Sequence, residues 1–169
     1  PDEPDCGFAA ALRRRPKLLV VCLGTGPTCI VLPLVRIIRA CDERGVDVLV
    51  DGAHAPGMLP LDITALGPAY YTGNLHKWVC APKGSAFLWV RPDKQTSFSP
   101  LVTSHGRNSQ REGRSLYLQE LDWMCTDDPS ALLPAPRAPA YLEQPHGAGR
   151  TGGISQDQDP GAPTLEATP

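Results

Sequence analysis

Residues 18–51, LLVVCLGTGPTCIVLPLVRIIRACDERGVDVLVD, contain two short apolar runs separated by a segment with helical periodicity. Leu18 to Leu23 is continuous and apolar, which is typical of a strand covered on both faces. From Ile30 to Arg44 the apolar positions recur at helical spacing, and Gly45 marks the end of the helix. Val46 to Val50 forms the second run. Strand, helix and strand with short links predict a βαβ unit and a parallel sheet.

Three further elements follow along the chain. Residues 62–67, DITALG, predict one or two helical turns, capped by Asp62 and ended by Gly67. Residues 69–72 and 85–90 predict a third and a fourth strand. The polar, glycine-bounded segment between these strands predicts irregular structure.

Composition narrows the class of protein. The 169 residues allow about one domain, and a net charge of −2 argues against a strongly basic nucleic-acid-binding module. On that charge we expect no nucleic-acid partner. No apolar run approaches the roughly 18 residues of a membrane span, so we expect no membrane partner either. None of the six cysteines has CxxC spacing, so we predict no metal site. Cys22 and Cys41 are expected to be free buried thiols in a reducing, cytoplasmic compartment.

The C-terminal part has a different character. Residues 107–120 are charged and lack a sustained period. Residues 134–169 contain seven prolines and five glycines in 36 positions, which predicts a disordered tail, because such a segment buries too little apolar surface to offset chain entropy.

Polar residues that can carry chemistry follow the predicted strands. Asp51 stands at the carboxyl end of an apolar strand, the edge at which α/β sheets bind ligands, and His54 follows three residues later. His76 and Lys77 follow the third strand. A partly desolvated lysine is a nucleophile toward carbonyls, and a carboxylate suits the ring nitrogen of pyridoxal phosphate. By spacing alone the alternatives stay open, since most strand-end aspartates are caps and most His-Lys pairs are solvated.

Two motifs add a resemblance to a known family. GVDVLVDGAHAPG (45–57) and TGNLHKWVCAPKGSAFLWV (72–90) resemble the class V aminotransferases, within them the isopenicillin N epimerase-like proteins. The resemblance is strongest over residues 30–92. It implies part of the large domain of the pyridoxal-phosphate-dependent transferase fold: a three-layer α/β/α arrangement with a mostly parallel sheet, in which the strand at 85–90 runs antiparallel.

The resemblance also implies a cofactor, pyridoxal 5′-phosphate, and roles for five residues. Lys77 would form the internal aldimine, a Schiff base, and later shuttle the substrate α-proton. Asp51 would pair with the pyridine nitrogen, and His54 would lie near the phenolic oxygen of the ring. Asn74 and His76 would hold the cofactor phosphate.

Other positions depart from the family pattern. Leu23, Gly24 and Gly26 stand where the family usually carries a histidine and polar side chains, and Thr25 is the candidate substitute. Near the end of the resemblance, Thr126 is retained at a position that contacts the phosphate of the neighbouring subunit.

The resemblance therefore implies a homodimeric enzyme that acts on an amino acid by epimerisation, transamination or β-elimination. Residues 1–100 would be a partial cofactor-binding large domain, 101–133 a divergent remnant of that domain, and 134–169 the tail. The alternative is a truncated, catalytically inactive fragment or pseudoenzyme that serves at most as an interaction module, because the chain resembles only the lysine-bearing middle of such an enzyme.

Overall fold

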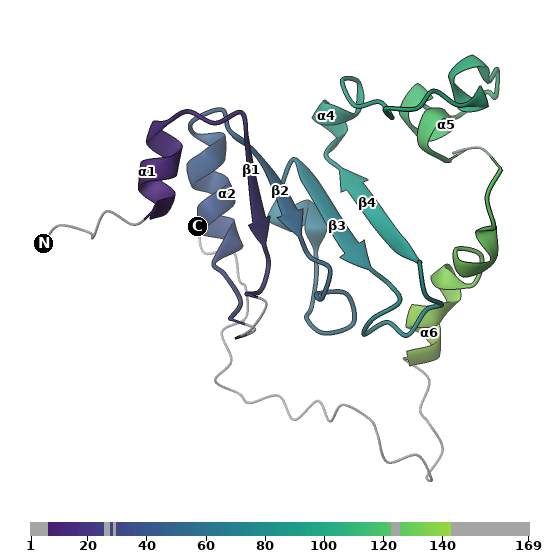
Figure 1. Ribbon diagram of the computed structural model, residues 1–169, viewed down its shortest axis with the longest axis horizontal. Coiled ribbons are helices and arrows are strands. Elements are labelled where there is room, and N and C mark those ends of the chain that lie inside the picture. The colour runs from purple at the N-terminus through teal and green to yellow at the C-terminus, as the bar shows by residue number, and fades with distance from the viewer. Residues whose placement is uncertain (1–6, 26–27, 29, 123–125, 143–169) are drawn as a thin grey trace, which may run out of the picture.

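A four-stranded sheet organises the structure, a computed structural model that describes residues 7–25, 28, 30–122 and 126–142 (Figure 1). Its strands, in spatial and chain order, are β1 (Leu18–Cys22), β2 (Asp47–Asp51), β3 (Tyr70–Asn74) and β4 (Ala86–Val90). The pairs β1–β2 and β2–β3 are parallel, and β4 is antiparallel to β3. The mostly parallel α/β sheet expected from the sequence is confirmed, including the reversed fourth strand.

The crossover helix α2 (Leu34–Asp42) is shorter than the predicted span of 30–44. It begins after Pro33, because a residue that precedes proline disfavours the helical conformation, and Val31 instead bridges back to Gly24. At the other end, Gly45 adopts φ +67°, the left-handed conformation that ends helices.

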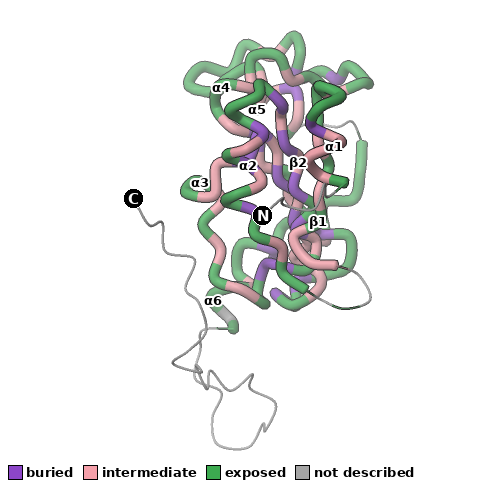
Figure 2. The backbone as a smooth tube through the Cα atoms, turned by 90° about the vertical axis from the view of Figure 1, so that its left-hand side faces the viewer, coloured by how far each residue is buried: buried purple, intermediate pink, exposed green. Residues whose placement is uncertain are grey.

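The core lies between α2 and one face of the sheet. Alternate residues of β2 and β3 are buried, and Val48, Val50 and Tyr71 are at most 1% exposed. Figure 2 shows the buried positions along β2. These three side chains pack against Ile38 and Cys41 of α2. The helices α1 (Gly7–Arg13) and α3 (Ile63–Leu66) add apolar side chains to the same cluster.

The opposite face of the sheet is open, which corrects the prediction that β1 is covered on both sides. Leu18 and Val20 of β1 are 44% and 60% exposed, and Leu88 of β4 is 41% exposed. Cys22 is exposed as well, whereas Cys41 is buried as expected. An apolar run shows that a strand is able to be buried on both faces. Whether both faces are in fact buried depends on other segments of the chain that pack against them. The three-layer arrangement implies one layer of helices on each face of the sheet. The described residues form the layer that contains α2 and α3.

The helix α3 forms as predicted. Its N-terminal cap is Asp62, whose Oδ1 accepts a hydrogen bond from the N–H of Ala65 at 2.9 Å, and Gly67 ends it at φ +71°. Four other α-helices were not predicted: α1, α4 (Pro92–Gln95), α5 (Leu116–Asp122) and α6 (Ala138–Leu142). Each is at most seven residues long, too short for a clear helical period.

The predicted tail at 134–169 is partly corrected. Residues 135–142 form the 3₁₀ turn η3 (Ala135–Arg137) and the helix α6 (Ala138–Leu142), since proline is compatible with the first turn of a helix. Residues 143–169 lie outside the described part of the chain, so their disorder stays a prediction. In the described residues, no helix has the length and apolarity needed to cross a bilayer.

Candidate active site

Two loops meet at the carboxyl ends of the parallel strands. Residues 52–61 follow β2, and residues 75–85 connect β3 to β4. At Gly57, which adopts φ +80°, the loops pack backbone against backbone, since an added Cβ would lie 2.8 Å from the carbonyl carbon of Trp78. This contact fixes the first loop against the second.

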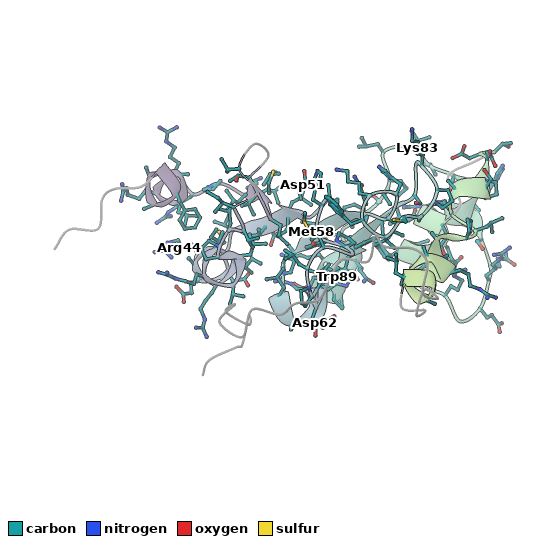
Figure 3. The ribbon with its side chains drawn as sticks, turned by 90° about the horizontal axis from the view of Figure 1, so that it is seen from below. Arg44, Asp51, Met58, Asp62, Lys83 and Trp89 are labelled. Atoms are coloured by element: carbon teal, nitrogen blue, oxygen red, sulfur yellow. The ribbon has the colours of Figure 1, made fainter. Side chains whose placement is uncertain are left out.

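Asp51 ends β2 with its side chain on the open face of the sheet. In Figure 3 it lies on the opposite side of the sheet from α2 and from Asp62. Its Oδ1 accepts a hydrogen bond from the N–H of Ala53 at 3.0 Å, so the carboxylate also stabilises the turn that begins the loop. Cys22 is the register partner of Asp51 on β1 and therefore points to the same face.

The most direct polar contact of the site joins the two loops. The Nζ atom of Lys77 lies 2.9 Å from Nε2 of His54. Because a lysine ammonium has donors and no acceptor, Nε2 is the acceptor, and the proton of the neutral imidazole is assigned to Nδ1. Lys77 is half-buried, whereas His54 is exposed.

A cavity of about 400 Å³ surrounds this pair. This volume lies within the range of cofactor and ligand sites in proteins, and apolar side chains form most of its wall. Its lining residues come from the ends of β1 and β2 and from the loops that follow: Cys22, Leu23, Gly24, Thr25, Val31, Asp51, Ala53, His54, Ala55, Met58, Leu59, Lys77 and Trp78.

On the β1 side of the cavity, two hydrogen bonds join Thr25 to Ile30. The N–H of Thr25 donates to the carbonyl of Ile30 at 3.0 Å, and Oγ1 of Thr25 accepts from the N–H of Ile30 at 3.0 Å. Thr25, the candidate substitute for a missing polar side chain, thus lines the cavity.

The remaining predicted site residues are absent from the described lining of this cavity. Asn74 ends β3 as the register partner of Ala86. His76 donates from Nδ1 to the carbonyl of Ser85 at 2.9 Å. Thr126 is exposed and follows residues 123–125, which are outside the described part. The structure therefore brings Asp51, His54 and Lys77 together and leaves the three phosphate assignments as predictions.

Several residues of the cavity wall were not predicted to belong to the site. Trp78 is 42% exposed and lines the cavity, as do Cys22 and Met58. The sequence could have indicated Cys22, because it ends a predicted parallel strand, and the carboxyl ends of such strands line ligand sites.

Tyr71 lies directly beneath this edge of the sheet. It is fully buried, and an added Cβ at Gly52 would overlap its hydroxyl. Its Oη atom has no hydrogen-bond partner among the described residues. Burial, and secondarily the Asp51 carboxylate, raises the pKa of Tyr71 to about 12.

Comparison with known proteins adds an independent result. A family model described as "Aminotransferase class-V" matches residues 5–127. The chain is 35% identical over 144 residues to "Putative L-cysteine desulfhydrase 2" of Oryza sativa subsp. japonica, covering 80% of this chain and 29% of that protein. It is 38% identical over 115 residues to "Isopenicillin N epimerase" of Amycolatopsis lactamdurans, covering 68% of this chain and 29% of that protein. The chain thus spans less than a third of these relatives.

The fold has counterparts among solved structures. The cysteine desulfurase CsdA from Escherichia coli superposes with a TM-score of 0.68 at 20% identity, over 82% of this chain and 36% of that chain. The match supports the fold and its mostly parallel sheet.

Proposed function

This chain belongs to the class-V aminotransferase family, and from that premise we propose that it binds pyridoxal 5′-phosphate at Lys77 and acts on an amino acid. One observation carries the proposal: the Lys77 amine and the Asp51 carboxylate line the same cavity at the carboxyl ends of β1 and β2. Catalysis and its substrate are proposals for the whole protein, of which this chain would be a part.

The chemistry of the lining fits this cofactor. Pyridoxal phosphate needs an amine for its aldehyde, an anion for its protonated ring nitrogen and an apolar enclosure for a flat ring. Lys77 supplies the amine, Asp51 the anion, and Met58, Leu59 and Trp78 part of the enclosure. When bound, the cofactor supplies an electron sink for the electrons released at the substrate α-carbon.

The residues of the chain would then have separate roles in cofactor binding and proton transfer. The Nζ atom of Lys77 would hold the cofactor and take the proton from the α-carbon. The Asp51 carboxylate would keep the ring nitrogen protonated, and the apolar wall would exclude water. His54 is assigned to the phenolic oxygen, and Asn74 and His76 to the phosphate, on the resemblance.

Removal of the α-proton is the step that the candidate reactions share. Epimerisation, transamination and β-elimination all begin with it, so the proposed substrate class is an α-amino acid. We propose a homodimer, in which Thr126 contacts the phosphate of the partner, and a cytoplasmic location.

Exchange of the α-proton tests this proposal without a choice of reaction. The chain is incubated in D₂O with pyridoxal phosphate and L-alanine or L-cysteine, and deuterium at the α-carbon is followed by NMR. We expect exchange with the wild type and loss of exchange with Lys77→Ala. Asp51→Asn should slow exchange far more than it weakens cofactor uptake, while Lys83→Ala should behave as the wild type. Wild-type exchange no faster than with free cofactor would contradict the proposal.

The open face of the sheet favours a second candidate, a non-catalytic interaction module. Leu18, Val20 and Leu88 leave apolar surface uncovered on strands β1 and β4, and exposed apolar patches mark association sites. This candidate predicts self-association or partner binding without cofactor uptake, so sedimentation and cofactor binding measured together separate the two.

A further inference from the structure

We propose that His54 is the base that takes the proton from Lys77 when Nζ attacks a carbonyl carbon. The inference deepens the proposed function and rests on it for its biological meaning. It assigns His54 a role toward the lysine itself, in addition to the contact with the cofactor ring that the family resemblance implies. Its test uses the chain without cofactor.

The geometry supplies the first argument. A lysine ammonium has no lone pair, so one proton must leave Nζ before the nitrogen can bond to carbon. Nε2 of His54 lies 2.9 Å from Nζ, inside the range required of a general base. Among the described residues, Nζ of Lys77 makes this one hydrogen bond. The Asp51 carboxylate lines the same cavity, but its recorded bond goes to the N–H of Ala53.

Backbone bonds hold the loops that carry the two side chains, which supplies the second argument. In the first loop the N–H of Ala55 donates to the carbonyl of Gly52 at 2.9 Å. In the second, the N–H of Cys80 donates to the carbonyl of Lys77 at 3.1 Å. With the close approach at Gly57, both loops are fixed at the base of the side chains that they carry. The fixed spacing of the two loops limits how far apart the two side chains can move, which favours proton transfer between them.

The proposed step balances as follows. Nζ first gives one proton to Nε2 of His54, and the lone pair that this frees then bonds to the carbonyl carbon. The resulting imidazolium returns that proton to the carbonyl oxygen. A second proton moves from the nitrogen through His54 to the same oxygen, which leaves as water when the carbon–nitrogen double bond forms, and a protonated imine remains on Lys77. His54 ends neutral, as it began.

The other lysines provide internal references. The chain contains four lysines, at positions 17, 77, 83 and 94. Lys94 is paired with Asp47 at 2.7 Å, and Lys83 is an exposed residue of the same loop as Lys77. In the described part of the chain, Lys77 alone has a recorded contact with an imidazole. Its reactivity can therefore be measured as a ratio to Lys83 within one sample.

The experiment measures reductive alkylation of the cofactor-free chain. The protein is treated at pH 7 with propionaldehyde and cyanoborohydride, and the alkylated fraction of each lysine is read by peptide mass mapping over time. We expect Lys77 to react on the order of 100-fold faster than Lys83, the lower end of what a positioned base contributes. His54→Ala should bring the ratio close to one, and added imidazole should restore much of the difference.

Two variants separate a base from a structural contact. His54→Gln keeps a hydrogen-bond acceptor but cannot carry the proton away, so it should be as slow as His54→Ala. His105→Ala removes an exposed histidine outside the cavity and should leave the ratio unchanged. A His54→Ala ratio equal to or above the wild type, full reactivity of His54→Gln, or absence of imidazole rescue would each overturn the assignment. Loss of cofactor binding with a normal ratio would contradict the proposed function and leave the inference standing.

Discussion

Replacement of Tyr71 by phenylalanine tests how the core is built beneath the site. The Tyr71 ring is fully buried and stacks on Phe87 with centroids 6.1 Å apart, while its hydroxyl has no partner among the described residues. A buried polar group without a partner destabilises a fold by about 1–3 kcal/mol. Tyr71→Phe keeps the ring and removes this group. We therefore expect the free energy of unfolding at pH 8 to rise by about 1 kcal/mol.

The same hydroxyl makes stability depend on pH. The pKa of Tyr71 is raised from 10.0 to about 12, first by burial and then by Asp51. Because the unfolded chain ionises first, the stability held by the neutral phenol is present below pH 10 and is lost as pH rises toward 12. A two-unit shift corresponds to a loss of about 1.4 kcal/mol at pH 11 and about 2.7 kcal/mol at the limit. The variant lacks this loss.

Urea unfolding followed by circular dichroism, at pH 8 and pH 11, measures both effects. The advantage of Tyr71→Phe over the wild type should grow from about 1 to about 2.4 kcal/mol. Tyr70→Phe, altered at the neighbouring position on the opposite face, controls for the loss of any one tyrosine hydroxyl. A variant less stable than the wild type at pH 8, or an advantage that does not widen at pH 11, would refute the reasoning.

Three further predictions, two of them with a comparison variant, concern the loops, the cap of α3 and the C-terminal part. Gly57→Ala should lower the free energy of unfolding in urea by about 1–3 kcal/mol, because φ is +80° and the new Cβ would lie 2.8 Å from the facing backbone. Gly45→Ala, at φ +67° with nothing within 4 Å, should cost no more than about 1 kcal/mol, and equal losses would contradict the packing argument. Asp62→Ala removes the N-terminal cap of α3 and should lower the free energy of unfolding, measured by thermal unfolding, by about 1 kcal/mol. Asp62→Asn keeps a side-chain oxygen that can accept the same hydrogen bond, so it should retain most of the stability of the wild type. Arg107→Ala leaves Glu120, 4% exposed and paired at 2.7 Å, without its cation. The loss should be about 1–2 kcal/mol, because the Arg107 side chain is itself 55% exposed; a loss below about 0.5 kcal/mol would show that the carboxylate finds other partners.

The sequence was most informative where local chemistry and fold agree. The run that ends at Asp51 predicts β2, and the cap at Asp62 with the glycine at 67 predicts α3 to the residue. The convergence of Asp51, His54 and Lys77 follows from a general property of parallel sheets, whose carboxyl ends share one edge. The contact between Nζ and Nε2 could not be derived in this way, since it depends on how two loops pack at Gly57.

Features set by distant segments could not be predicted. The continuous apolar run of β1 has the pattern of a covered strand, yet Val20 is 60% exposed because the described helices pack on the other face. Trp78 is a large aromatic residue of the type usually found in a core, but it lies next to Lys77 in the chain and lines the cavity. The helix α5 is specified largely by tertiary contacts, among them the ion pair of Glu120 with Arg107. Such features need the positions of neighbours that lie elsewhere in the chain.

Covalent capture of the cofactor tests the central claim most directly. The chain is incubated with pyridoxal phosphate, reduced with borohydride and mapped by peptide mass spectrometry, with Lys77→Ala and Lys83→Ala treated in parallel. The account predicts one pyridoxyl group per chain, confined to Lys77, absent from Lys77→Ala and unchanged in Lys83→Ala. Labels scattered over positions 17, 77, 83 and 94 in similar amounts would contradict it, because the cavity would then give Lys77 no preference over an exposed amine.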